Sequence, residues 1–191
     1  MSFGLPSDKF PPFTAMGSWA GDYDGIPVYY GAPDFVSALI GTNTLAPGKA
    51  CDRAGTSEGL NVCVTDEELP IGDESLRVLP SVMAGLWNVS YLIGDTGVSV
   101  DEYLGELGEG VERLKRATGR QNLEFVIAGG HGENTALCKL KARHTGATFI
   151  KTQVSNAELL GNAIIAFTAL GKFGTLTDAA ERIVHNLVRF D

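Results

Sequence analysis

The chain has 191 residues, with 15 Lys and Arg against 23 Asp and Glu, which gives a formal net charge of −8. This length suits one domain with a sizeable core, and the 44% hydrophobic and 20% charged fractions argue against disorder. The net acidity leaves no basic footprint for nucleic acid or an anionic membrane surface. We therefore expect small molecules or proteins as partners.

The sequence also carries information about compartment. Its N-terminal residues lack the basic and apolar regions of a signal peptide, and no apolar run approaches the ~20 residues of a membrane span. The three cysteines, Cys51, Cys63 and Cys138, cannot close a disulfide framework and form no C-x-x-C pair. No His or Cys cluster has metal-ligand spacing. We expect a cytoplasmic, reduced protein with no metal site of its own.

The first half of the chain is predicted to be mainly strands. Residues 1–25 are rich in Pro, Gly and aromatic side chains and are interpreted as an extended arm or linker remnant. A short β-rich run over 26–31 leads through Asp34 into a helix over 35–40. Two short strands around a Gly-Thr-Ser turn are predicted over 50–65, and two more over 76–82 and 86–93.

The second half alternates helices and strands. Ser99-x-x-Glu102 is a capping box that predicts a helix to about residue 117. A buried strand over 125–128 is followed by a Gly-rich loop, a helix from Asn134 to about 144, and a strand over 148–152. A second capping box, Ser155-x-x-Glu158, predicts a buried, nearly all-apolar helix to about 171. A one-faced apolar stripe over 176–188 predicts a final helix.

This order indicates an α/β domain with a mixed sheet over residues 26–191. Glycine is in excess, at 24 of 191 residues, against a usual share of about 7%. Three polar Gly turns follow predicted strands, at 55–57, 94–97 and 129–132. Such turns can direct backbone N–H groups at phosphate oxygens, although each taken alone is also explained as an ordinary turn. The P-loop and G-x-G-x-x-G signatures are absent.

Asp34 is the most informative single residue. It lies at a strand-to-helix junction, where catalytic carboxylates are often found, but Asp is also a favoured helix N-cap. His131 is either a ligand contact or a solvated loop side chain, and Asn134 is also explained as an N-cap. The runner-up carboxylates beside the Gly turns are Asp52, Glu58 and Asp95, which by default are interpreted as solvated turn residues.

Taken in order, five segments resemble motifs of the C-terminal domain of the FGGY carbohydrate kinases, which include xylulokinase, gluconokinase and glycerol kinase. Tyr30-Gly31-Ala32-Pro33-Asp34-Phe35 resembles the family's Gly-x-x-Asp motif, and Ala54-Gly55-Thr56-Ser57-Glu58 resembles its Gly-Thr phosphate turn. Residues 94–97 fall where the family has a second phosphate turn, and 128–134 resemble its adenosine motif. Residues 158–163 are similar to the helix that follows, so the resemblance covers nearly the whole chain from about Pro27.

The resemblance implies an actin/hexokinase-like (ribonuclease H-like) ATPase lobe with a mixed central sheet flanked by helices. It implies a carbohydrate kinase that uses ATP and Mg²⁺ and transfers the γ-phosphoryl group to a hydroxyl of a sugar or polyol, with a xylulose-like ketose favoured. Asp34 would be the catalytic base. The residues implied to bind the nucleotide are Gly55, Thr56, Ser57, Gly94, Thr96, Gly129, Gly130, His131 and Asn134.

Three departures from the family bear on this expectation. The N-terminal lobe, with its phosphate loop and most of the sugar site, is absent, and His131 stands where the adenosine motif has its third Gly. Between the 94–97 turn and the Gly129 strand there is also only one helix, where many relatives have a longer stretch.

The chain is therefore expected to be inactive alone and to be completed by an N-terminal lobe or a partner chain. Its uncovered apolar face could also form a homo-oligomer. The alternative is a catalytically inactive nucleotide-binding or protein-interaction module with the same fold. A third alternative, a hydrolase that uses Asp34 with His131, has little support, because the sequence shows no base and nucleophile at a recognisable spacing.

Overall fold

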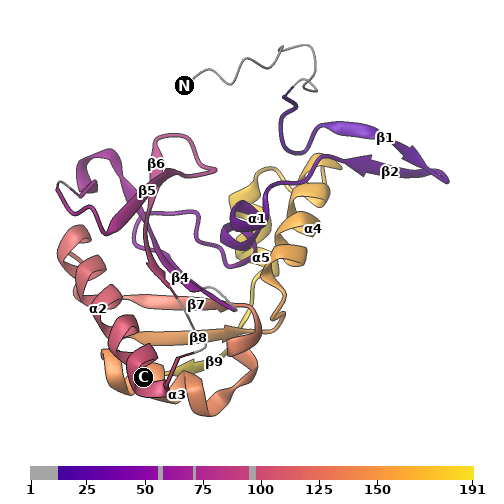
Figure 1. The fold of residues 1–191 in the computed structure, drawn as a ribbon. Helices are drawn as coiled ribbons and strands as arrows, with labels where there is room; N and C mark the ends of the chain where they lie inside the picture. The colour runs from indigo at the N-terminus through magenta and orange to yellow at the C-terminus, as the bar shows by residue number, and fades with distance from the viewer. Residues whose placement is uncertain (1–12, 56–57, 71, 95–97) are drawn as a thin grey trace, which may run out of the picture.

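The computed structural model describes residues 13–55, 58–70, 72–94 and 98–191 (Figure 1). Within these ranges, seven strands form a central sheet in the order β5-β6-β4-β3-β7-β8-β9, and β1 pairs only with β2. The strands are β1 Trp19–Tyr23, β2 Ile26–Tyr29, β3 Ala50–Ala54, β4 Glu58–Thr65, β5 Leu76–Pro80, β6 Leu86–Ile93, β7 Glu124–Ala128, β8 Thr148–Thr152 and β9 Asn186–Phe190. The helices are α1 Asp34–Gly41, η2 Asp66–Glu68, α2 Val100–Thr118, η3 Gly130–Glu133, α3 Thr135–Thr145, α4 Ala157–Ala169 and α5 Leu176–Ile183.

The central sheet is mixed, as the sequence predicted. β3, β7 and β8 are parallel to one another, whereas β4, β6, β5 and β9 each run antiparallel to their neighbours. Parallel strands need a crossover segment between them, and α2 and α3 supply those connections. The carboxyl ends of the three parallel strands therefore meet at one edge of the sheet.

Helices cover both faces of the sheet (Figure 1). On one face, Leu107, Val111 and Leu114 of α2 pack with Phe125 and Phe149 in the largest buried cluster. On the other face lie α1, α4 and α5, which contribute two smaller apolar clusters. None of the helices in the described ranges combines the length and apolarity needed to cross a bilayer.

Backbone contact joins α1 to α4. A Cβ built at Gly41 would lie 1.9 Å from the carbonyl oxygen of Ala157, and one at Gly161 would lie 1.9 Å from that of Ser37. Only glycine permits so close an approach of two helix backbones. These two glycines therefore fix where α1 lies on the sheet.

Most predicted elements are present, but two predictions are wrong. Within the predicted arm, Trp19–Tyr23 forms strand β1 of a hairpin that lies apart from the central sheet (Figure 1). Helix α4 is capped by Asn156, not Ser155, and Leu159 and Phe167 are exposed on its outer side. The predicted last helix ends at Ile183, and residues 186–190 instead form β9, because their backbone pairs with the otherwise open edge of β8.

Candidate active site

The Gly turns predicted from the sequence converge at the carboxyl-end edge of the parallel strands. Arg53 and Ala128 are partners in the β3–β7 register, so Gly55 and Gly129 follow neighbouring strand ends. Glu58 is opposite Ile93, which places Gly94 beside the start of β4. Thr56, Ser57 and Thr96, and likewise Asp95, lie outside the described residues.

Gly129 is held in a conformation that requires glycine. Its φ is 96°, and a Cβ there would lie 2.5 Å from the carbonyl oxygen of Ala54. Its N–H donates to the carbonyl of Ser155 at 3.2 Å. A Cβ at Gly130, in contrast, would meet nothing within 4 Å. The loop is thus held in place at Gly129 by close packing and a hydrogen bond. The backbone of Gly130 faces open space, so a ligand could approach it closely.

Asp34 is the first residue of α1, and Pro33 is the N-cap, so the predicted N-cap role of Asp34 is wrong by one position. Its side chain is 76% exposed, and Oδ2 lies 3.4 Å from Nη2 of Arg53. Its Oδ1 accepts a hydrogen bond from the Phe35 N–H at 2.6 Å. Arg53 is the penultimate residue of β3, so this contact brings the carboxylate to the edge that carries the Gly turns.

Asn162 of α4 holds the turn that leads into Asp34. Its Oδ1 accepts from the Ser37 hydroxyl at 3.2 Å and from the Ala32 N–H at 3.4 Å, while its Nδ2 donates to the carbonyl of Glu158 at 3.1 Å. A Cβ at Gly31 would lie 2.6 Å from the same Oδ1. The sequence predicted only a helix here and gave no sign of this role.

Beneath the Gly turns lies a buried charge network. Lys141 of α3 has no solvent-exposed side-chain surface, and its Nζ donates to Asp52 Oδ2 at 2.7 Å and to Glu58 Oε1 at 2.9 Å. The hydroxyl of Tyr103 donates to Glu58 Oε2 at 2.7 Å. The prediction that Asp52 and Glu58 are solvated turn residues is therefore wrong; both face inward because they alternate with strand residues that point to the other face.

The network controls which carboxyl group is ionised. Burial, followed by the charge of Glu58, raises the pKa of Asp52 to about 8. Burial also opposes ionisation of Glu58, but the nearby His131 and the charge of Lys141 outweigh it and hold the pKa of Glu58 below its usual range. Burial disfavours the ammonium of Lys141 as well, but the two carboxylates raise its pKa. Glu58 and Lys141 thus form the ion pair.

His131 joins this network to the surface. Its Nδ1 lies 3.2 Å from Glu58 Oε2, its ring meets Tyr103 edge-on at 6.0 Å, and 23% of its side chain is exposed. It is therefore not the freely solvated loop side chain that was the alternative. Asn134 does cap α3, accepting from the Leu137 N–H at 3.1 Å, which leaves a ligand role at this residue a prediction.

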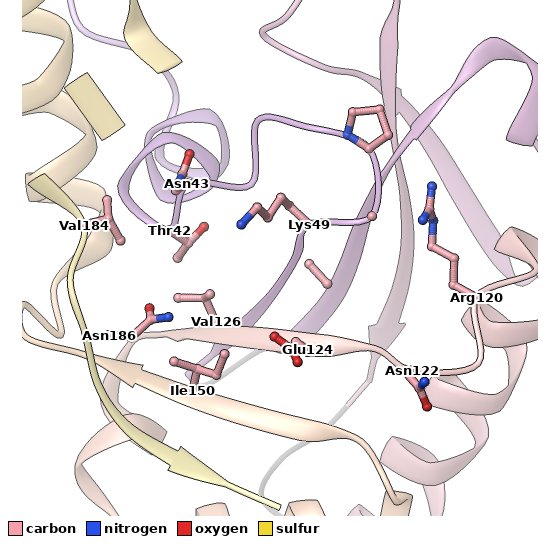
Figure 2. Close-up of a pocket in the computed structure, with 13 residues that line it drawn as sticks. Thr42, Asn43, Lys49, Arg120, Asn122, Glu124, Val126, Ile150, Val184 and Asn186 are labelled. Atoms are coloured by element: carbon pink, nitrogen blue, oxygen red, sulfur yellow. The ribbon is translucent and has the colours of Figure 1, made fainter. Parts of the chain in front are cut away.

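Two pockets adjoin the sheet. A pocket of about 600 Å³ opens beside the Gly turns, on the side of β4 and β6 that faces away from α2. The other, of about 450 Å³, lies at the opposite edge, where Ala50 and Glu124 begin β3 and β7 (Figure 2). Lys49 and Thr42 also line it. This second pocket is a full strand length from the Gly turns and contains none of the predicted site residues, so it is not the candidate site.

The carboxyl-end edge therefore places the exposed carboxylate of Asp34 near the closely packed backbone of Gly129 and the open backbone of Gly130. Within the described ranges, no group of three or more His, Cys, Asp or Glu side chains is arranged to hold a metal ion. The three cysteines are buried free thiols.

No protein-family model matches the sequence, and no curated protein matches it. Solved structures match through the fold. Ligand-bound xylulose kinase from Lactobacillus acidophilus gives a TM-score of 0.70 at 10% identity, over 97% of this chain and 54% of that one. Glycerol kinase with ADP from Plasmodium falciparum gives 0.69 at 14%, over 87% and 47%. Gluconate kinase from Lactobacillus acidophilus gives 0.66 at 11%, over 88% and 48%.

At these identities the comparisons show the fold alone. They confirm that the fold is the one predicted from the resemblance to FGGY carbohydrate kinases, an actin/hexokinase-like lobe. The chain spans about half the length of the structures it matches.

Proposed function

We propose that this chain is the C-terminal, nucleotide-binding lobe of an ATP-dependent carbohydrate kinase. The observation that carries the proposal is the convergence of Asp34 and the backbone of Gly55, Gly94 and Gly129 at one sheet edge. The fold is shared with sugar and polyol kinases. A second lobe, on the same polypeptide or a partner chain, would complete the site, since phosphoryl transfer needs water excluded and both reactants aligned.

In the proposed reaction, the Asp34 carboxylate takes the proton of an acceptor hydroxyl. The acceptor oxygen forms a bond to the γ-phosphorus as the bond to the β-phosphate oxygen breaks, and ADP leaves with that electron pair. Backbone N–H groups of the Gly turns would bind the phosphates, other than those of Gly94 and Gly129, which donate to Glu106 Oε1 and to the Ser155 carbonyl. Adenosine would lie near Gly129, Gly130, His131 and Asn134. Mg²⁺ would be bound largely through the nucleotide phosphates, since it usually takes only one or two protein carboxylates.

Nucleotide binding is tested by calorimetric titration of the chain with ATP and ADP. The Gly130→Ala variant should fold normally, because its Cβ meets nothing within 4 Å, but should bind ATP more weakly because the methyl group enters the proposed adenosine site. Gly105→Ala, exposed on α2 with equally open space, is the matched control. Equal ATP affinity in all three proteins would contradict the assignment of this loop.

Catalysis is tested with Asp34→Asn once the lobe is assayed together with its complement. Loss of a general base should lower kcat by roughly 10²- to 10⁴-fold, while Asp101→Asn, at the equivalent turn of α2, should leave it unchanged. An unchanged kcat in Asp34→Asn would refute the proposed base. ATP binding without any transfer by the completed wild-type protein would instead favour an inactive nucleotide-binding module.

A further inference from the structure

The 600 Å³ pocket beside the Gly turns lies next to the residue proposed as the base. Phe35, adjacent to Asp34, lines it, as do Arg53 and Gly94. Leu60 and Val62 of β4 point into the core under α2, so the alternate residues Gly59 and Asn61 face the pocket. The pocket thus opens on the sheet surface between the start of α1 and strands β6 and β5.

The charge presented in this pocket is positive, although the whole chain carries −8. Among the described residues that line it are Arg53 and Arg77 and a single acidic residue, Glu58, whose carboxylate is buried against Lys141 and Tyr103. Arg77 is exposed and makes no ion pair with any described residue. Nε of Arg53 is buried without a hydrogen-bond partner in the described part of the chain. Arg53 also contacts Asp34, so the guanidinium available to a ligand is that of Arg77, and a guanidinium favours a planar anion.

The floor of the pocket is polar and buried. Asn61 and Ser90 are 1% and 2% exposed, and the Ser90 hydroxyl donates to Asn61 Oδ1 at 2.5 Å. Asn61 Nδ2 is in turn occupied by the carbonyl of Gly59 at 2.7 Å. The Ser90 oxygen therefore keeps lone pairs that can accept from a ligand hydroxyl. A polar pair at this depth suits a polyhydroxylated ligand better than an apolar one.

The two arginines mark opposite ends of the pocket. Arg53 is on β3 and Arg77 on β5, and the sheet order places three strand spacings between them, about 14 Å between backbones. Arg53 reaches Asp34, so the reacting hydroxyl belongs at that end. Arg77 lies on the same row as Ser90 and Asn61, its partners across β6 and β4.

We propose that this pocket binds the phosphoryl acceptor, and that the acceptor is a polyhydroxy acid whose carboxylate pairs with Arg77. The inference rests on the proposed kinase function and names its substrate class: an acidic sugar derivative in place of the neutral, xylulose-like ketose that the sequence resemblance favours. Because the carboxylate end lies at Arg77 and the base at the other end, the hydroxyl phosphorylated is the one remote from the carboxylate.

The test is a calorimetric titration of the chain with a matched pair of probes, D-gluconate and D-glucitol, which differ in having a carboxylate or a neutral alcohol at one end. Gluconate should bind measurably tighter. Arg77→Gln should weaken gluconate binding roughly ten- to hundredfold, the usual loss of one charge-assisted contact, and leave glucitol unaffected. Arg143→Gln, exposed on α3 across the sheet, is the matched control, and thermal unfolding of each variant verifies folding.

Three results would overturn the inference: equal binding of the two probes, an unchanged gluconate affinity in Arg77→Gln, or no binding of either probe. Tighter binding of glucitol 6-phosphate than of gluconate would assign the anion as phosphate and refute the carboxylate. ATP titrated into the same preparations separates the two proposals. If the chain binds ATP but does not prefer gluconate, only the substrate class is refuted. If it binds neither ATP nor gluconate, the kinase proposal is refuted as well.

Discussion

Replacing Lys141 by Met is the sharpest test of the buried network. The substitution keeps the length of the side chain and removes its charge, leaving Asp52 and Glu58 without the ammonium group that lies 2.7 and 2.9 Å from them. Breaking a buried ion pair from one side typically costs about 3–5 kcal/mol. The fold should survive, because α2, α3 and the sheet share a large apolar core.

The magnitude follows from protonation. Without Lys141, the least costly response is for Glu58 to bind a proton, as Asp52 already tends to do because burial raises its pKa. The ordinary pKa of Glu58 is 4.5. Protonating it at pH 7 therefore costs about 3.4 kcal/mol, at about 1.4 kcal/mol per pH unit. At pH 5 the same step costs under about 1 kcal/mol.

Urea unfolding of wild type and Lys141→Met at pH 7 and pH 5 measures both values. We expect a loss of about 3 kcal/mol at pH 7 that shrinks to about 1 kcal/mol at pH 5. Lys139→Met, the same change at an exposed position of α3, should be neutral at both. A loss that does not change with pH would show that packing, and not charge compensation, is what Lys141 supplies.

Two further predictions concern stability. Because burial and then the charge of Glu58 raise the pKa of Asp52 to about 8, the folded chain keeps a proton that the unfolded chain releases above about pH 4. Wild-type stability should therefore fall between pH 5 and 8 by up to about 1.4 kcal/mol per pH unit relative to Asp52→Asn; parallel pH curves would contradict this. Gly161→Ala should lose at least about 1–3 kcal/mol by overpacking the α1–α4 contact, whereas Gly105→Ala should not destabilise, as thermal unfolding of the two will show.

The sequence predicted those features whose signal is local. The Ser99–Glu102 capping box does begin α2, and Asn134 and Gly146 do bound α3. The β3–β4 hairpin is where the Gly-Thr-Ser turn predicted it. Each depends on residues a few positions apart, for which cap and turn chemistry is decisive.

The missed features depend on residues far apart in the chain. Lys141 lies 89 positions from Asp52 and 83 from Glu58, and nothing beside any of the three reveals the contact. One signal was present: Lys141 shares the buried stripe of α3 with Cys138, Ala142 and Thr145. A lysine at such a position requires a buried anion.

The last helix was mispredicted because an apolar stripe continued past the point where helix α5 ends. Residues 186–190 carry side chains that suit either structure, and the open edge of β8 decides the outcome. The local sequence of 186–190 does not indicate that β8 has an unpaired edge in the folded sheet.

The backbone contact between α1 and α4 constrains the C-terminal half of α1 and leaves its N-terminal turn unconstrained by that contact. Its eight residues extend about 12 Å, and the glycine contacts clamp only the Ser37–Gly41 half. Residues around Phe35 are therefore free to vary, whereas Gly41 and Gly161 each exclude a side chain independently, because each faces a backbone carbonyl of the other helix. If the proposed acceptor pocket is correct, substrate range would change at one end of a helix whose register is fixed at the other.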